Sequence, residues 1–288
     1  MSTATTPRTA SAPSASVPTA ARVTPWHVLR SEWIKLWTLR STYWTVALTV
    51  AVLVLLAWAM AFSFSLAPEG TYPGADGSAG IVYMLLGPGQ IFGSLVLIVL
   101  AALTVTGEYT TGQVRSTFAA VPRRLPVLWA KGLVVALVSF ATAAVGTALS
   151  LLLAGALEPA MRPDWADPEM LRVVVGTPLY IMTLALLGFA VGALLRNSAA
   201  AIATTIGFVL IIESVLNLIP WKALEYVRPF LPSSAGVRVA TPQEMLDMTD
   251  SMATVAVSLS PWAGYAVLVG WVAVILLAAA VRLRTRDV

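Results

Sequence analysis

The sequence predicts an all-α integral membrane protein with six transmembrane helices, and two observations lead to this prediction. The chain has 288 residues, of which 58% are hydrophobic and only 11% are charged. Soluble domains are roughly half apolar and about one quarter charged, so this chain has too few charges to cover a surface in water. In addition, six segments of 20 or more residues are almost free of charged side chains. A helix of about 20 apolar residues crosses the hydrocarbon core of a bilayer.

The predicted spans cover residues 43–66, 81–106, 132–157, 173–195, 198–219 and 262–281. Residues 25–288 therefore form a single transmembrane domain. Residues 1–24 differ in composition, because 19 of them are Ala, Ser, Thr or Pro. They lack the apolar core of a signal peptide and the hydrophobicity that folding requires, which predicts a disordered cytoplasmic tail.

Lys and Arg are distributed unequally between the two sides of the predicted helices. The side that holds both termini carries thirteen basic and three acidic residues, whereas the other side carries five basic and ten acidic residues. Cytoplasmic loops are enriched in Lys and Arg. The distribution therefore predicts that both termini are cytoplasmic, which agrees with an even number of spans.

Several classes of chemistry are excluded by composition. The chain has no cysteine and one histidine, His27, which excludes disulfides, thiolate metal sites and a metal site built on paired histidines. The sequence contains no phosphate-binding GxxxxGK[ST] motif and no GxSxG or HExxH motif. We therefore expect no enzymatic activity, cofactor, metal or nucleic-acid partner. A pathway, a gate or a receptor for another protein stays possible.

Residues 26–40 predict an amphipathic helix that lies on the inner membrane surface. At 100° per residue its apolar side chains form one stripe, which consists of Trp26, Leu29, Trp33, Leu36 and Trp37. Tryptophan favours the membrane–water interface. The helix could be a simple anchor, or it could also contact a partner.

Two further segments have distinctive patterns. Gly87, Pro88 and Gly89 predict a kink or a late start of the second span, because proline removes a backbone donor. The segment 220–261 is too apolar for a solvated loop, and an irregular loop of this length is uncommon. We expect it to form short helices that dip into the outer leaflet or pack over the outer mouth, with breaks at Pro229, Pro232 and Pro242 and a further helical stretch at 243–258. Gly188 and Gly192 form a GxxxG pair that permits close helix packing, within the chain or at a dimer contact.

Glu213 is the only Asp, Glu, Lys or Arg within the predicted spans. An acid near the middle of a bilayer costs about 2.5–3.5 kcal/mol, so it is expected to face protein, water or a partner. Asn217 lies one helical turn further along on the same face. Two interpretations stay open: a structural acid, protonated or paired with Lys or Arg, and a group that lines a substrate pathway.

The second span ends in the polar sequence GEYTTGQVRSTFAAVPRR at 107–124. Residues 114–121 can form a short helix, which Pro122 ends before Arg123 and Arg124. A short helix held between two spans provides a mechanical contact point for a cytoplasmic protein. An ordinary basic loop that fixes the topology explains the pattern equally well.

These residues resemble a known family. The sequence LTVTGEYTTGQVRSTFAAVPRR at 103–124, followed by Lys131, is similar to the corresponding segment of ABC-transporter permeases of the type-2 exporter class, particularly actinobacterial ones. The sequence LRSEWIKLWTLRSTYW at 29–44 is similar to the N-terminal interfacial helix of the same family. Six spans, cytoplasmic termini and a long outer segment before the last span also agree. The resemblance covers residues 25–288.

The resemblance implies a permease subunit in a bacterial cell membrane that forms the pathway of an ATP-driven exporter. It implies two copies of a separate ATP-binding subunit, and a second copy of this chain or a sister permease as partner. The helix around 110–121 would be the coupling helix that inserts into the ATPase, supported by 26–40, and the outer segment would form re-entrant helices. The residues implied in coupling are Glu108, Tyr109, Gly112, Arg115, Phe118, Pro122, Arg123 and Arg124.

Two other functions stay open. An ion-coupled secondary transporter needs titratable groups or broken helices at corresponding positions of two related halves. Glu213 and the Gly87–Gly89 break are the available features, and they do not correspond in position. A membrane receptor or immunity protein that transports nothing is the other alternative.

Overall fold

The computed structural model describes residues 24–66, 78–112, 124–252 and 256–285, which contain helices and no strand. Within these ranges six helices are long and apolar enough to cross a membrane: Arg40–Ser65, Ser78–Thr110, Leu125–Leu157, Pro168–Leu195, Ser198–Leu218 and Pro261–Thr285. The prediction of a six-span, multi-pass, all-α protein is confirmed at this level. Five of the six helices are longer than predicted, because polar residues at their ends, such as Glu108 and Arg282, are also helical.

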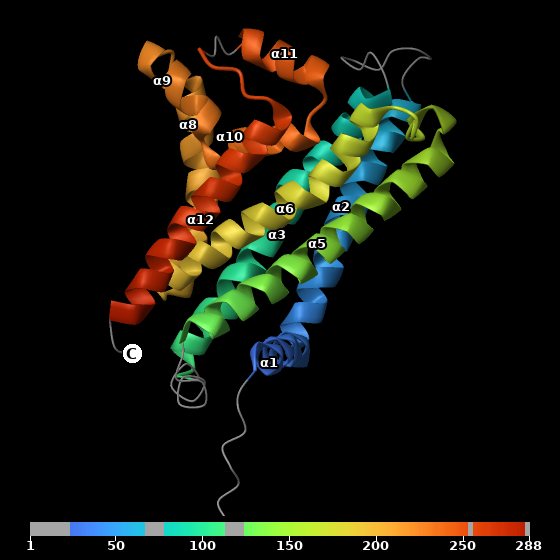
Figure 1. Ribbon diagram of the computed structural model, residues 1–288. Helices are drawn as coiled ribbons and strands as arrows, with labels where there is room; N and C mark the ends of the chain where they lie inside the picture. The colour runs from blue at the N-terminus through green and yellow to red at the C-terminus, as the bar shows by residue number, and fades with distance from the viewer. Residues whose placement is uncertain (1–23, 67–77, 113–123, 253–255, 286–288) are drawn as a thin grey trace, which may run out of the picture.

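The spans pack side by side around one central helix. Helices α2 (Arg40–Ser65), α3 (Ser78–Thr110), α5 (Arg124–Leu157), α6 (Pro168–Leu195) and α12 (Pro261–Thr285) run alongside one another, and α1 (Pro25–Thr38) lies crosswise at one end (Figure 1). Helix α6 contacts α3, α5 and α12 and is the most buried of the spans. The fifth span consists of α7 (Ser198–Ile206), a π-helical turn (η2, Gly207–Ile212) and α8 (Glu213–Leu218).

The glycines of the spans bring helix backbones together within the chain. A Cβ atom on Gly188 would lie 2.9 Å from Cγ2 of Ile98, and one on Gly192 would lie 2.8 Å from Cγ1 of Val105. The GxxxG pair of α6 therefore packs against α3, as the intrachain interpretation predicted.

The predicted late start of the second span is wrong, because α3 continues unbroken through Pro88. Gly89 instead permits contact with Leu53 of α2, whose backbone would lie 3.2 Å from an added Cβ atom.

The segment between the fifth and sixth spans forms a cap at the end of the bundle opposite α1 (Figure 1). It contains α9 (Lys222–Val227), η3 (Arg228–Phe230), α10 (Pro232–Gly236), η4 (Val237–Ala240) and α11 (Gln243–Met252). The prediction of short helices interrupted near prolines is confirmed. Of the helix expected at 243–258, the structure describes Gln243–Met252 as helical and 256–258 as non-helical. Helix α10 packs against α12, and η4 packs against both α6 and α12, which joins the cap to the core.

Buried arginines hold this cap together. The guanidinium of Arg238 donates to both carboxylate oxygens of Asp250, at 2.9 and 2.8 Å, and its Nε donates to the carbonyl of Leu259 at 2.7 Å. The guanidinium of Arg172 on α6 donates to the carbonyl of Thr241 at 2.8 Å, just beyond η4. Carbonyls at helix ends lack partners within their own helix. Charge-assisted hydrogen bonds therefore compensate for the short length of the cap helices.

The contact between α10 and α12 generates a stability prediction. A Cβ atom on Gly264 would lie 2.4 Å from the carbonyl oxygen of Ala235, whereas nothing lies within 4 Å of such an atom on Gly270 of the same helix. We expect Gly264→Ala to cost about 1–3 kcal/mol, because the backbone of α10 has to move. Gly270→Ala is the matched control and should be neutral or slightly stabilising. Thermal unfolding of the purified protein in detergent measures both, and equal unfolding temperatures would contradict the close contact.

Candidate functional site

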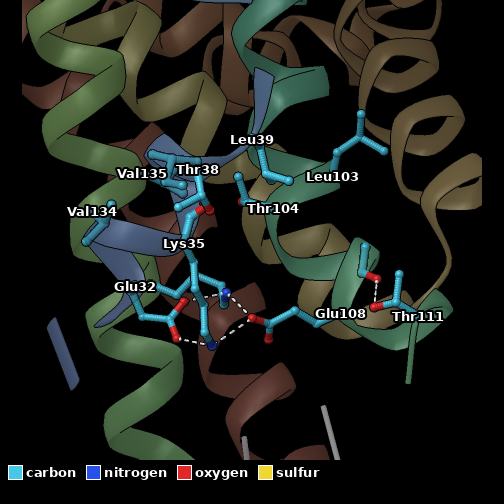
Figure 2. A pocket seen from close by; sticks show the side chains of 13 residues that line it. Glu32, Lys35, Thr38, Leu39, Leu103, Thr104, Glu108, Thr111, Val134 and Val135 are labelled. Atoms are coloured by element: carbon cyan, nitrogen blue, oxygen red, sulfur yellow. Dashed lines mark hydrogen bonds and ion pairs between the residues drawn. The ribbon is translucent and has the colours of Figure 1, made fainter. Parts of the chain in front are cut away.

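A cluster of four charged side chains, two buried and two half-buried, joins three helices at the end of the bundle that holds α1. Glu32 and Lys35 come from α1 and Glu108 from α3 (Figure 2), and Lys131 comes from α5. The Nζ atom of Lys131 lies 2.5 Å from Glu32 Oε2 and 2.9 Å from Glu108 Oε1. The Nζ atom of Lys35 lies 2.8 Å from Glu32 Oε1 and 3.1 Å from Glu108 Oε1. Each ammonium group thus bridges both carboxylates, and the formal charges cancel.

The ionic cluster is largely removed from solvent. Glu32 is 3% exposed and Lys131 is 8% exposed. A buried charge requires close partners, because transfer out of water costs several kcal/mol for each ion. Four mutually paired charges meet this requirement together. Loss of any one of them would leave a net charge in the buried site.

Packing of α1 against α5 aligns the ionic cluster. Glu32 and Lys35 are three residues apart and therefore lie on the same face of α1. On this face Leu36 is buried against Val134 and Val138 of α5. The hydroxyl of Thr42 at the start of α2 donates to the carbonyl of Leu36 at 2.7 Å. The sharp corner between α1 and α2 is thereby fixed, which holds α1 crosswise to the spans.

The ionic cluster lies between the two ends of the segment 113–123. Glu108 is two residues before the end of α3, and Lys131 lies in the second turn of α5. Beyond α3, Gly112 has φ of +72°, a left-handed conformation that favours glycine. Tyr109 packs against the main core, and the guanidinium of Arg196 lies 5.3 Å from the centre of its ring. The end of α3 is therefore also attached to the turn between α6 and α7.

A cavity of about 280 Å³ opens beside the ionic cluster. Its wall contains the four charged side chains together with polar groups such as Thr104 and Thr111 (Figure 2). Such a cavity can admit water or a polar group of another molecule. Among the described residues, no group of His, Asp and Glu has the arrangement needed to hold a metal ion.

The structure places some of the residues implied in coupling. Glu108, Tyr109 and Gly112 lie together at the end of α3, as expected for a junction between span and segment. Arg124 begins α5. Arg115, Phe118, Pro122, Arg123 and the predicted helix around 114–121 lie outside the described residues. Their role stays a prediction.

The predicted stripe of the interfacial helix divides into two parts. Leu36 is buried and Leu29 and Trp37 are half-buried, whereas Trp26 and Trp33 are 68% and 44% exposed. The apolar stripe therefore contacts the protein along one edge only. The other edge is available to the bilayer, which is consistent with an interfacial helix.

Sequence reasoning did not identify Glu32, Lys35 and Lys131 as a site. Lys35 lies outside the predicted apolar stripe of residues 26–40, and its side chain proves to face α3 and α5. One signal was available: Glu108 at the boundary of a span needs a cation nearby. Glu32 and Lys131 are 99 positions apart, and nothing in the sequence indicates that these two residues meet.

Glu213, the acid within the fifth span, is 2% exposed and is bonded by backbone groups. Its Oε1 accepts from the amide of Ser233 at 2.8 Å, and its Oε2 accepts from the amide and the hydroxyl of Ser234, both at 2.8 Å. The prediction that Lys or Arg pairs with Glu213 is wrong, because the donors are groups of Ser233 and Ser234 in the first turn of α10. Asn217 is exposed on the surface of α8. These hydrogen bonds join α10 of the cap to the fifth span, and the role of Glu213 stays a prediction.

The ionic cluster generates a prediction for alkaline pH. Burial lowers the pKa of the Lys35 amine, but Glu32 and Glu108 outweigh this effect, so the pKa lies above the ordinary value of 10.5. The stabilisation from Lys35 is therefore complete below pH 10.5 and is lost as the pH rises through the folded-state pKa. We expect Lys35→Gln to reduce the loss of thermal stability in this range. Lys222→Gln, at an exposed position, is the control, and identical pH profiles for the parent and Lys35→Gln would refute the pairing.

Glu213 generates a second prediction. The side chain of Glu213→Gln offers one acceptor oxygen instead of two and turns an amide N–H₂ toward backbone donors. Because a buried donor left unpaired costs about 1–3 kcal/mol, we expect lower thermal stability and a lower yield of folded protein. Asn217→Ala, which changes an exposed side chain of the same helix, should match the parent. A Glu213→Gln protein as stable as the parent would argue against the structural role.

In comparisons with known proteins, no family model matches this chain and no curated protein matches it significantly.

Proposed function

We propose that this chain is the permease subunit of an ATP-driven exporter of the ABC type-2 class. It would form the translocation pathway and receive mechanical work from a separate ATP-binding subunit. The proposal rests on the two sequence motifs at 29–44 and 103–131 and on the six apolar helices. The substrate stays open.

The ionic cluster is the observation that carries this proposal. Glu108 and Lys131 flank the segment 113–123, and Glu32 and Lys35 bind both of them from the crosswise helix α1. A force applied to this segment by a soluble partner would reach α3 and α5 together. It would then pass to α6, because α6 contacts both helices. Such rigid coupling suits a permease that responds to an ATPase, whereas a loop that only fixes topology has no need of it.

The structure also argues against the alternative function, an ion-coupled secondary transporter that would use Glu213 as its coupling-ion site. Glu213 is the only acid in the central part of a span, and three donors from the cap already engage its carboxylate. A coupling-ion site requires an acid whose oxygen atoms can bind and release the ion. The bonding of Glu213 therefore favours transport driven from outside the membrane domain.

In this proposal the end of the bundle that holds α1 faces the cytoplasm of a bacterial cell, in accordance with its excess of Lys and Arg. Two copies of the ATP-binding subunit would dock below the ionic cluster. A second permease copy or a sister permease would complete the pathway. The fifth span offers a surface for this contact, since Ile211, Val215 and Leu218 are 63%, 49% and 82% exposed.

Truncation of Phe118 tests the proposal. Apolar anchors dominate many protein interfaces, with about 2 kcal/mol or more lost at a true hot spot, so we expect Phe118→Ala to reduce co-purification of the ATP-binding subunit from native membranes by roughly tenfold or more. The double change Arg123→Ala, Arg124→Ala should have a smaller effect, because exposed ion pairs contribute about 0–1 kcal/mol.

Phe62→Ala is the matched control. Phe62 is an exposed aromatic side chain near the end of α2 that lies away from α1. Membrane insertion should be normal in every variant. If no ATP-binding subunit co-purifies with the parent, or if Phe118→Ala binds it as the parent does, the proposal is wrong.

A further inference from the structure

A long apolar groove lies between the second half of α5 and the first half of α6. It has a volume of about 820 Å³, which is within the range of small-molecule sites, roughly 300–1,000 Å³. Its wall is formed mainly by apolar side chains, among them Phe140, Ala148 and Leu152 of α5 and Val175 and Pro178 of α6. It is remote from the ionic cluster, because α5 carries Lys131 near its opposite end.

The groove has the length of one leaflet. The α5 residues in its wall extend from Phe140 to Ala156, which corresponds to about 24 Å along a helix that rises 1.5 Å per residue. Half of a bilayer, headgroups included, is about 20–22 Å thick. Arg162 and Trp165, which follow the end of α5, line one end of the groove, which is called its open end below because both side chains are exposed. The apolar part therefore matches an acyl chain, and the end with Arg162 matches the level of the headgroups.

The guanidinium of Arg162 is held at this open end. Its Nε donates to the carbonyl of Gly155 at 3.0 Å. A Cβ atom on Gly155 would lie 2.9 Å from Cγ of Arg162, so the glycine provides room for the arginine stem. Among the described residues no carboxylate forms an ion pair with Arg162. A guanidinium with available donors matches the geometry of a phosphate group.

Acidic residues lie on both sides of Arg162 in the sequence. Glu158 precedes the 3₁₀ turn η1 (Pro159–Met161), and Asp164 and Asp167 follow Arg162. Asp164 is exposed, and one of its oxygens accepts from the amide of Ala166. A single cation among acids complements a headgroup that carries both a phosphate and an ammonium group. A headgroup with net negative charge would be repelled by these acids.

We propose that the groove binds a phospholipid with a phosphoethanolamine headgroup, in the leaflet opposite to α1. One acyl chain lies along α5, the phosphate binds Arg162, and the ammonium group faces the nearby acids. This lipid seals the space between α5 and α6 on the membrane side. The site is independent of the ionic cluster and of the ATP-binding partner.

Lipid binding to the purified full-length chain tests the proposal. Native mass spectrometry counts the lipids retained from detergent solution when phosphatidylethanolamine and phosphatidylglycerol with identical chains are supplied together. We expect the parent to retain one phosphatidylethanolamine with a preference of about tenfold, as one charge-assisted contact gives. Arg162→Gln should lower the retention of both lipids, because both carry a phosphate, and Ala148→Trp should abolish retention by filling the groove. Ala273→Trp, on the exposed face of α12, is the matched control.

The remaining outcomes would overturn the proposal. Equal retention of both lipids by the parent would exclude recognition of the headgroup. Undiminished lipid retention by Arg162→Gln would exclude the phosphate contact, and this result does not depend on whether Ala148→Trp folds. Equal retention by Ala148→Trp and Ala273→Trp would place the lipid elsewhere on the protein.

Discussion

Four paired charges at one end of the helix bundle, two of them buried and two half-buried, constrain the rest of this structure. Because Lys131 and Lys35 each bridge Glu32 and Glu108, α1, α3 and α5 cannot separate without exposing an unpaired charge. This requirement holds α1 crosswise and fixes both ends of the segment 113–123. The orientation of α1 therefore depends on ion pairing as well as on the affinity of its tryptophans for the bilayer.

Polar groups also hold the opposite end of the bundle, by a different arrangement. The cap helices are too short to be stable alone, and side chains from elsewhere satisfy their terminal backbone groups. The carboxylate of Glu213 accepts hydrogen bonds from two backbone amides of α10. The guanidinium of Arg228 donates to the carbonyl of Leu216 near the end of α8. Between the two polar ends lies a core in which small residues bring α6 close to α3. Polar contacts thus hold both ends of the bundle, and apolar packing holds the middle.

The architecture was predictable from the sequence because apolar length and charge-free runs are local properties. Helix α1, the short helices of the cap and the close packing at Gly188 and Gly192 were likewise predictable from local sequence patterns. The ionic cluster was not predictable, because it joins residues 23 to 99 positions apart whose meeting depends on how α1 docks. The partner of Glu213 was missed for a related reason. Sequence reasoning looked for a cation, whereas the structure supplies backbone amides that any residue type could carry.

A double-mutant cycle across Glu32 and Lys131 tests the central claim most directly. Either Glu32→Gln or Lys131→Met leaves a net charge in the buried site, and the account predicts that each costs about 3–5 kcal/mol of unfolding free energy. The double variant retains the Lys35–Glu108 pair at 3.1 Å with no net charge. It should therefore be much more stable than the sum of the single effects predicts. If the two single effects are small, or if they simply add, the four charges do not act as one unit and the account is contradicted.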